Sequence, residues 1–388
     1  MFDEIINRRG SNSIKWQVQP GELPMWIADM DFATAPAVVA AMKAKVNSGV
    51  FGYEEVPAAY FTAVADWYEQ RDHQRPDPAW MSFASGVMPA IGAMIRQLTQ
   101  PGDQIVVQAP VYNMFFSTIA VNGRTAASAD LSYNPQTARY AIDFDRLEPV
   151  LAQPASTLML LCNPHNPIGK AWSKADLTQI ATLCVKHHVR LIADEIHGDL
   201  VFGEPAYTPV FSLPDELRAN SIVCVSPSKT FNLAGIHAAT VMVPDAALHA
   251  QVDRALATAQ VAEPNALATT ATIAAYTQGG QWLDALKAQL TTNRQTLATC
   301  LATQLPSVRL ASENATYLAW LDISQVSADS AAFCQWLRAE TGLILAAGDA
   351  YHGNGAHFLR LNLACPPQML DDGLQRLVAG VTKYPHAS

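Results

Sequence analysis

Short apolar runs alternate with longer helical patterns along most of this chain, and this alternation constrains the fold more than any other feature. Five runs have the length and composition of strands buried on both faces: residues 104–110, 156–164, 189–195, 220–228 and 239–244. Between the second and third runs, Ser173 and Asp176 are spaced as a capping box at the start of a helix. The alternation predicts a parallel sheet with helices on both faces.

The C-terminal part of the chain has a different character. A chain of 388 residues exceeds the size at which one core keeps growing, so we expect two domains. From about residue 281 a long helical pattern extends to Leu305, and short apolar runs and a final helical pattern near 368–382 follow it. The proline-rich segment before Pro36 is too extended for a helix, and a helix is expected to start near Pro36. We therefore expect an N-terminal segment that joins the small domain, a large domain and a small α+β domain: residues 1–45, 46–280 and 281–388.

Composition excludes several classes of partner. The chain has 25 Lys and Arg against 34 Asp and Glu, a formal net charge of −9, so we expect no binding to nucleic acid or to an anionic membrane. The first residues lack the apolar core of a signal peptide, which predicts a cytoplasmic protein. The six cysteines are scattered and are expected to be reduced, and no His or Cys spacing indicates a metal site.

Polar side chains follow the predicted strands at the points where the strands end. They are Tyr112, Asn163, Asn166, Asp194, His197, Ser226, Ser228 and Lys229. In α/β sheets ligands bind beyond the carboxyl ends of the strands, so these side chains are expected to meet at one edge. An Asp or Asn in this place is commonly a turn former, but a partly desolvated lysine has a lowered pKa that suits Schiff-base chemistry. Ser226–Lys229 also spells the S-x-x-K of penicillin-binding enzymes, although the partner motif S-D-N is missing.

Four ordered motifs resemble those of one enzyme superfamily. They are NPHNPIGK at 163–170, ADEIHGD at 193–199, SPSKTFN at 226–232 and FLRLN at 358–362. Together they resemble the fold-type I pyridoxal-phosphate enzymes, the aspartate-aminotransferase-like superfamily. PMWIADMDF at 24–32, GVFGYEEV at 49–56 and His197 resemble more narrowly its cystathionine β-lyase branch of carbon–sulfur lyases. The resemblance implies the pyridoxal-phosphate-dependent transferase fold: α/β, with a large domain built on a mostly parallel seven-stranded sheet and a smaller α+β C-terminal domain.

The resemblance also implies which residues bind pyridoxal phosphate. Lys229 would hold the aldehyde and remove the Cα proton of the substrate, and Asp194 would keep the pyridine nitrogen protonated. Asn166 would bond the ring hydroxyl, Tyr112 would stack on the ring, and His197 would lie beside it. The phosphate would lie at a helix start, with two serine hydroxyls and a tyrosine of the neighbouring subunit as further donors: Ser85, Gly86, Val87, Met88, Ser226, Ser228 and Tyr53.

Four residues are expected to contact the substrate. Arg360 would bind the substrate carboxylate bidentately, with Asn166 beside it, and Trp26 and Ala28 would line the entrance. Tyr53 implies a homodimer with active sites at the subunit interface. His237 stands where many aminotransferases have an arginine, and both a hydrogen bond to the phosphate and a structural role stay open.

The function that follows is a pyridoxal-phosphate-dependent carbon–sulfur β-lyase of amino-acid metabolism. Its expected substrates are cystathionine, cysteine or related S-substituted cysteines, and its products pyruvate, ammonia and a thiol. A class I/II aminotransferase is the first alternative, because it shares every step up to the carbanion. A binding or regulatory protein with this fold is the second, although Lys229, Asp194 and Arg360 are all present.

Overall fold

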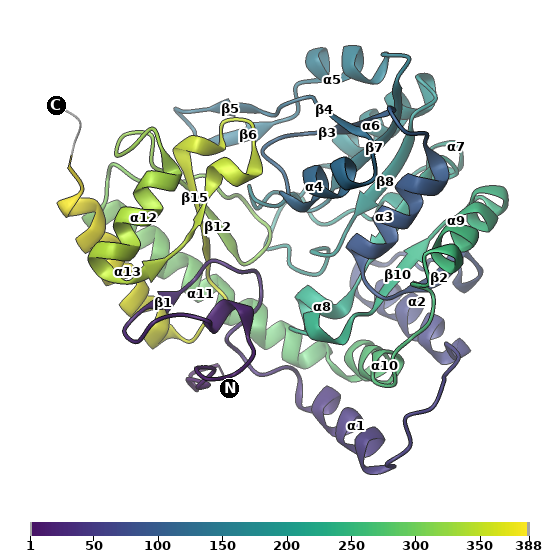
Figure 1. The fold of residues 1–388 in the computed structure, drawn as a ribbon, viewed down its shortest axis with the longest axis horizontal. Helices are drawn as coiled ribbons and strands as arrows, with labels where there is room; N and C mark the ends of the chain where they lie inside the picture. The colour runs from purple at the N-terminus through teal and green to yellow at the C-terminus, as the bar shows by residue number, and fades with distance from the viewer. Residues whose placement is uncertain (1, 386–388) are drawn as a thin grey trace.

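The larger of the two main sheets has seven strands, of which all but one run parallel. A computed structural model describes residues 2–385, and the strand order within it is β2, β10, β9, β8, β7, β3, β4 (Figure 1). Among these described strands only β10 is antiparallel to its neighbours. The bounds are β2 (Met81–Ala84), β3 (Gln104–Val107), β4 (Thr125–Ser128), β7 (Ser156–Cys162), β8 (Arg190–Asp194), β9 (Ser221–Val225) and β10 (Ala239–Met242). The predicted mostly parallel seven-stranded sheet is confirmed.

Helices cover both faces of this sheet because its strands are apolar on both sides. Along β8, Leu191 and Ala193 pack into one core and Ile192 packs into the other, as the two-residue period of a strand requires. On the first face lie α2 (Ala58–Asp72), α5 (Phe144–Leu151), α6 (Lys174–Lys186) and α10 (Ala268–Gln278). On the second face lie α3 (Val87–Leu98), α4 (Met114–Val121) and α9 (Ala246–Thr258). The apolar cores on the two faces of the sheet together bury nearly all residues of the five predicted runs.

The expected helix start after β7 is confirmed at α6. The Ser173 hydroxyl accepts a hydrogen bond from the backbone N–H of Asp176 at 3.1 Å. The Asp176 carboxylate in turn accepts one from the backbone N–H of Ser173 at 3.1 Å. This reciprocal pair satisfies two N–H groups that the first turn of a helix leaves free.

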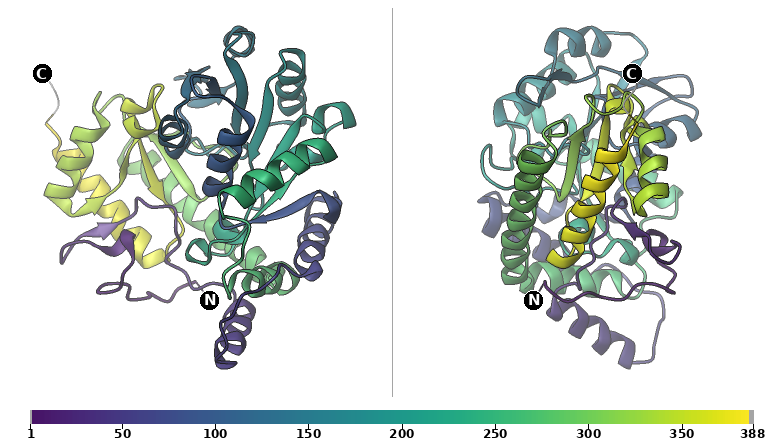
Figure 2. Two further views of the ribbon diagram at one scale, coloured as in Figure 1. Left: turned by 45° about the vertical axis from the view of Figure 1, so that its right-hand side comes forward. Right: turned by 90° about the vertical axis from the view of Figure 1, so that its left-hand side faces the viewer.

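The second main sheet has four antiparallel strands and is separate from the first. Its order is β11 (Arg309–Leu310), β12 (Leu318–Asp322), β15 (Phe358–Asn362) and β14 (Ala346–Ala347). α11 (Gly280–Gln304), α12 (Ser330–Thr341) and α13 (Pro367–Lys383) pack on it through a separate apolar core (Figure 2). The long and final helices predicted from the sequence are therefore confirmed as α11 and α13. Within residues 2–385 we find no helix long and apolar enough to cross a membrane.

Among the described residues the N-terminal segment has no α-helix before α1 (Pro36–Asn47), as predicted, although residues Ile14–Trp16 form one 3₁₀ turn. β1 (Leu23–Pro24) pairs in parallel with β13 (Leu343–Ile344) beside the small sheet. We call residues 23–32 the strap. Asn362 of β15 donates hydrogen bonds to the Ile27 and Asp29 carbonyls at 2.7 Å. Asn232, in the segment that follows β9 of the large sheet, donates to the Met30 and Phe32 carbonyls at 3.0 and 2.9 Å. In Figures 1 and 2 this purple segment runs from the small sheet toward α1.

The remaining elements are short. A hairpin of β5 (Ser132–Asn134) and β6 (Arg139–Ala141) lies between β4 and α5, and α7 (Asp215–Arg218) precedes β9. One-turn helix α8 (Pro227–Thr230) follows β9 and carries Lys229. The division of the chain at residues 46 and 281 stays a prediction.

Candidate active site

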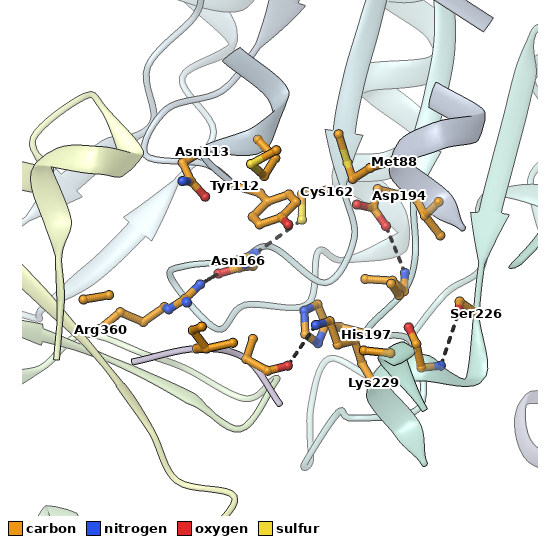
Figure 3. Close-up of a pocket in the computed structure, with 18 of the residues that line it drawn as sticks. Met88, Tyr112, Asn113, Cys162, Asn166, Asp194, His197, Ser226, Lys229 and Arg360 are labelled. Atoms are coloured by element: carbon orange, nitrogen blue, oxygen red, sulfur yellow. Dashed lines mark hydrogen bonds between the residues drawn. The ribbon is translucent and has the colours of Figure 1, made fainter. Parts of the chain in front are cut away.

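The predicted site residues line one cavity of about 830 Å³, with three exceptions: Tyr53, Ser85 and Asn163. The cavity lies beyond the carboxyl ends of β3, β7, β8 and β9, and the strap and the β13 to β15 region close its other side. This is the place where open parallel sheets bind ligands, and the volume suits a cofactor and a small substrate. Figure 3 shows Arg360 and Asn166 on one side, and Asp194, His197, Lys229 and Ser226 on the other.

Lys229 is held at the cavity by the tight turn that follows β9. The Ser226 hydroxyl caps α8 by accepting from the Ser228 N–H at 3.1 Å, and it donates to the Ala238 carbonyl at 2.6 Å. Lys229 Nζ donates to the Ala28 carbonyl of the strap at 2.8 Å. Burial, aided by the positive charge of Arg360, lowers the pKa of the Lys229 amine to about 8. Roughly a tenth of the molecules therefore carry the neutral, nucleophilic amine at pH 7, far more than for an ordinary lysine.

Asp194 ends β8 with its carboxyl group in the cavity. The residue is 4% exposed, and burial raises its pKa to about 6, while a hydrogen bond from the Ile196 N–H at 3.2 Å opposes the shift. At neutral pH the group is thus mainly a carboxylate, with an unused oxygen in a poorly hydrated site. Such a carboxylate favours a cationic partner, for example a protonated ring nitrogen.

His197 provides a neutral imidazole beside Lys229. Burial first, and then the charges of Lys229 and Arg360, lower its pKa to about 3. Its Nδ1 atom is buried and has no hydrogen-bond partner within the described part of the chain. Buried polar atoms are nearly always paired in folded proteins, so this atom marks a place for a ligand group.

Arg360 comes from the small sheet and reaches into the cavity from β15. Its guanidinium donates to Asn166 Oδ1 and to the Trp26 carbonyl, each at 3.0 Å, and lies 4.9 Å from the centre of the Tyr351 ring. Its buried Nε has no partner among the described residues. A planar guanidinium fixed in this way is suited to bind a carboxylate.

The start of α3 provides a site for an anion. Gly86 has φ 138° and precedes a twelve-residue helix whose first turn has no side-chain cap. Its φ lies in the left-handed half of the map, where glycine is favoured. The free N–H groups at Val87 and Met88 and the positive end of the helix dipole favour a phosphate, and Ser228 lines the same cavity. Ser226 also lines it, but its hydroxyl proton is donated to the Ala238 carbonyl, so the predicted phosphate donor is engaged elsewhere in this structure.

The two predicted tyrosines have different surroundings. Tyr112 lines the cavity after β3, and burial together with the charge of Asp194 raises its pKa to about 12, so it stays a neutral phenol. Tyr53 lies in the loop between α1 and α2, is fully exposed and does not line the cavity. Its contact with a neighbouring subunit stays a prediction.

Several residues that line the cavity were not predicted from the sequence. The Cys162 thiol lies opposite Asp194 in the β7–β8 register, and burial holds its pKa well above the usual range. Apolar residues of the N-terminal segment and of the small sheet also line the cavity, for example Ile14, Leu345 and Ala347. Apolar side chains carry no motif, so only the fold reveals that these residues face a site.

The residues of the cavity fit pyridoxal phosphate. Four kinds of group face one space. Lys229 provides an amine for the aldehyde, and Asp194 provides a buried carboxylate for the ring nitrogen. Asn166 provides an amide for the ring hydroxyl, and the helix start at Val87 and Met88 suits the phosphate. The unpaired His197 Nδ1 is the observation that most directly calls for a further ligand group.

Comparison with known proteins gives the same result. The family model for aminotransferase class I and II matches residues 24–377. The chain is 38% identical to cystathionine beta-lyase PatB of Bacillus subtilis over 98% of this chain and 100% of that protein. It is 32% identical to protein MalY of Escherichia coli over 98% of each chain. The structure matches that of cystalysin from Treponema denticola, which contains a pyridoxal 5′-phosphate cofactor, with a TM-score of 0.95 at 27% identity over 99% of both chains.

The motifs, the fold, the cavity and these relatives agree on cofactor and reaction type. The predicted pyridoxal-phosphate-dependent fold and cofactor are confirmed, and the lyase branch is favoured over a plain aminotransferase. This chain belongs to the aminotransferase class I and II family and, within it, to the pyridoxal-phosphate-dependent carbon–sulfur lyases.

Proposed function

We propose that this protein cleaves the Cβ–S bond of S-substituted L-cysteines by α,β-elimination. The observation that carries the proposal is one cavity that joins an amine of lowered pKa, Lys229, to a carboxylate-binding arginine, Arg360, with the buried carboxylate of Asp194 beside them. The net reaction turns the substrate and one water into a thiol, pyruvate and ammonia. Pyridoxal phosphate, when bound, supplies the electron sink for the carbanion at Cα.

Lys229 is the group that moves the proton. Its amine, with a pKa of about 8, accepts the Cα proton, and the electron pair left at Cα expels the sulfur from Cβ as a thiolate. The same ammonium, once formed, is a proton source for the departing thiolate. The hydrogen bond from Lys229 Nζ to the Ala28 carbonyl holds the amine at the strap side of the cavity.

Arg360 and Asn166 orient the substrate. The Nη1 group of Arg360 is fixed by Asn166 Oδ1, so the guanidinium keeps one plane for the α-carboxylate. The Trp26 carbonyl, which accepts from Nη2, ties the strap to the same arginine. Substrate bound at Arg360 therefore lies beneath the strap, and the strap excludes water from the reacting atoms.

We place a second copy of the chain against the end of α1 and the loop that follows it. Val46, Val50, Phe51 and Tyr53 are 48%, 69%, 59% and 104% exposed. A cluster of exposed large apolar side chains on a segment that projects from the body is typical of an interaction surface (Figure 1). In this homodimer Tyr53 reaches the phosphate end of the partner's cavity. Sedimentation of the holoenzyme as a monomer with full activity would contradict the placement.

A cytoplasmic location is part of the proposal. All six cysteines are free, and Cys162, Cys184 and Cys224 are buried within the large sheet layer. Free thiols in this number suit a reducing compartment.

The experiment that tests the elimination uses holoenzyme, S-ethyl-L-cysteine and no oxoacid. We expect pyruvate and ethanethiol in equal amounts, with ammonia. A parallel reaction contains an added oxoacid as amino acceptor. The amount of the amino acid formed from that oxoacid measures transfer of the amino group. Amino transfer without pyruvate and thiol would assign the protein to the aminotransferases instead.

A further inference from the structure

The Ala28 carbonyl of the strap accepts two hydrogen bonds, one from each of the two main layers of the molecule. Lys229 Nζ donates to it at 2.8 Å, and the Tyr317 hydroxyl donates to it at 3.0 Å. Lys229 lies in α8 after the large sheet, whereas Tyr317 directly precedes β12 of the small sheet. A carbonyl oxygen has two lone pairs, so these two donors occupy both of them. The amine that moves the proton and the tyrosine hydroxyl thus share one acceptor atom.

Tyr317 is held in place by contacts to both layers. Its side chain is buried, and its carbonyl accepts a hydrogen bond from the Leu363 N–H at 2.8 Å in the small layer. The preceding Thr316 N–H donates to the Leu200 carbonyl of the large layer, also at 2.8 Å. The Tyr317 ring lies edge-on to His197, with the two ring centres 6.1 Å apart. The hydroxyl of Tyr317 therefore comes to the strap from a rigid support.

The peptide groups on both sides of Ala28 are held as well. Asn362 donates to the Ile27 and Asp29 carbonyls, each at 2.7 Å, and Tyr317 fixes the carbonyl between them. Burial, with the negative charge of Asp29, raises the pKa of Tyr317 well above its ordinary value, so the hydroxyl keeps its proton and stays a donor. The Ala28 oxygen is therefore fixed in direction, and its second lone pair faces the lysine amine.

We propose that Tyr317 is a positioning residue for the proton transfer at Cα: it holds the Ala28 carbonyl that keeps the free amine of Lys229 in place. A general base must lie within hydrogen-bond reach of the proton that it takes, and a displacement of about 1 Å can cost about 10²-fold in rate. The lysine side chain is long and flexible, so without a fixed acceptor its amine samples many positions. When the Cα–H bond breaks, the proton goes to Nζ and the electron pair stays at Cα. The ammonium that forms keeps the same carbonyl as its acceptor. This role rests on the β-lyase activity proposed above.

Exchange of the Cα proton of L-alanine in heavy water isolates the proton transfer, because L-alanine has no leaving group at Cβ. Lys229 takes the proton, the ammonium exchanges with the solvent, and a deuteron returns to Cα. Tyr317→Phe keeps the ring and removes only the hydroxyl. We expect exchange by the holoenzyme at saturating L-alanine, followed by proton NMR, to fall by about 3- to 10-fold. The L-alanine concentration for half-saturation should not change, because Arg360 still binds the carboxylate.

Tyr60→Phe is the matched control. Tyr60 is also buried, and its hydroxyl donates to the Ala239 carbonyl at 3.2 Å, but it does not line the cavity. This variant should exchange L-alanine at the wild-type rate. Absorbance titration of both variants with pyridoxal phosphate adds a measurement that does not depend on turnover, and both should bind the cofactor as tightly as the wild type does.

Equal exchange rates in Tyr317→Phe and Tyr60→Phe would overturn the assignment. A fall in exchange matched by weaker binding of L-alanine or of pyridoxal phosphate would also overturn it, because the hydroxyl would then support the fold of the site. Exchange by the wild type without pyruvate from S-ethyl-L-cysteine would contradict the proposed elimination and leave the test of Tyr317 in force. A wild type that exchanges no proton would refute the role of Lys229 and, with it, that of Tyr317.

Discussion

Asp31 fixes the strap to the residues that precede it in the N-terminal segment. Replacing Asp31 by asparagine tests what holds the strap beside the active site. One carboxylate oxygen accepts from Arg8 Nη1 and from Trp16 Nε1, both at 2.7 Å, and the other accepts from Lys15 Nζ at 2.7 Å. Lys15 and Asp31 have side-chain exposures of only 1% and 2%. Asp31→Asn keeps the shape of the side chain but removes the charge that both cations face.

The size of the effect follows from burial. A hydrogen bond to a charged group contributes about 1.5–3 kcal/mol, but three that share one carboxylate do not add. Breaking a buried ion pair from one side costs about 3–5 kcal/mol, because the remaining charge is left unpaired. We therefore expect Asp31→Asn to lower the free energy of unfolding by about 3–5 kcal/mol. Because the loosened strap carries Trp26 and Ala28, KM should also rise for every substrate.

Urea unfolding at one fixed protein concentration measures the loss, since dimer dissociation would otherwise contribute. Glu22→Gln is the matched control: Glu22 also joins the N-terminal segment to another element, through Arg338 at 2.7 and 2.9 Å, but Arg338 is 48% exposed. This exposed pair should contribute less than about 1 kcal/mol. Removing both buried charges in Lys15→Met/Asp31→Leu should recover part of the loss. A loss in Asp31→Asn no larger than that in Glu22→Gln would refute the reasoning.

Three further predictions concern the groups that line the cavity. Arg360→Lys loses the planar contacts to Asn166 and Trp26, and kcat/KM should fall by about 10- to 100-fold in steady-state assays; an effect under threefold would contradict the carboxylate role. Asp194→Asn removes a buried charge that faces the cofactor ring, so kcat should fall by about 10²-fold or more with the cofactor still bound, as absorbance would show. The Lys229 pKa of about 8 lies below the ordinary 10.5, so the amine is neutral above pH 8. The rate of cofactor uptake by apo-protein should therefore rise through pH 8 and level off, whereas a continued rise toward pH 10 would contradict the lowered pKa.

The edge of the large sheet could be predicted from the sequence for a physical reason. Asn166, Asp194 and Lys229 each follow an apolar run, and the carboxyl ends of parallel strands meet at one edge. The convergence of these three residues could therefore be predicted from the alternation of apolar runs and helical patterns alone. The predicted runs were longer than the strands, for example 104–110 against Gln104–Val107, because the polar and proline residues after each strand leave the sheet to form the site.

The second sheet and the strap could not be predicted in this way. Arg360 was identified by resemblance alone, because its distance from Lys229 depends on how two separate layers pack. Trp26 faces the cavity because Asn362 and Asn232 hold the strap from opposite sides, and no local pattern encodes such contacts. The edge strand β4 was missed because its residues are partly exposed and lack an apolar run.

Lys229→Ala, with chemical rescue, tests the central claim most directly. The variant should bind pyridoxal phosphate without a covalent bond and release no pyruvate from S-ethyl-L-cysteine above about 10⁻³ of the wild-type rate. Added methylamine, which can enter the cavity and accept the Cα proton, should restore pyruvate release in proportion to its concentration. Pyruvate release by Lys229→Ala within tenfold of wild type, without added amine, would contradict the role of Lys229 and with it the account of this site.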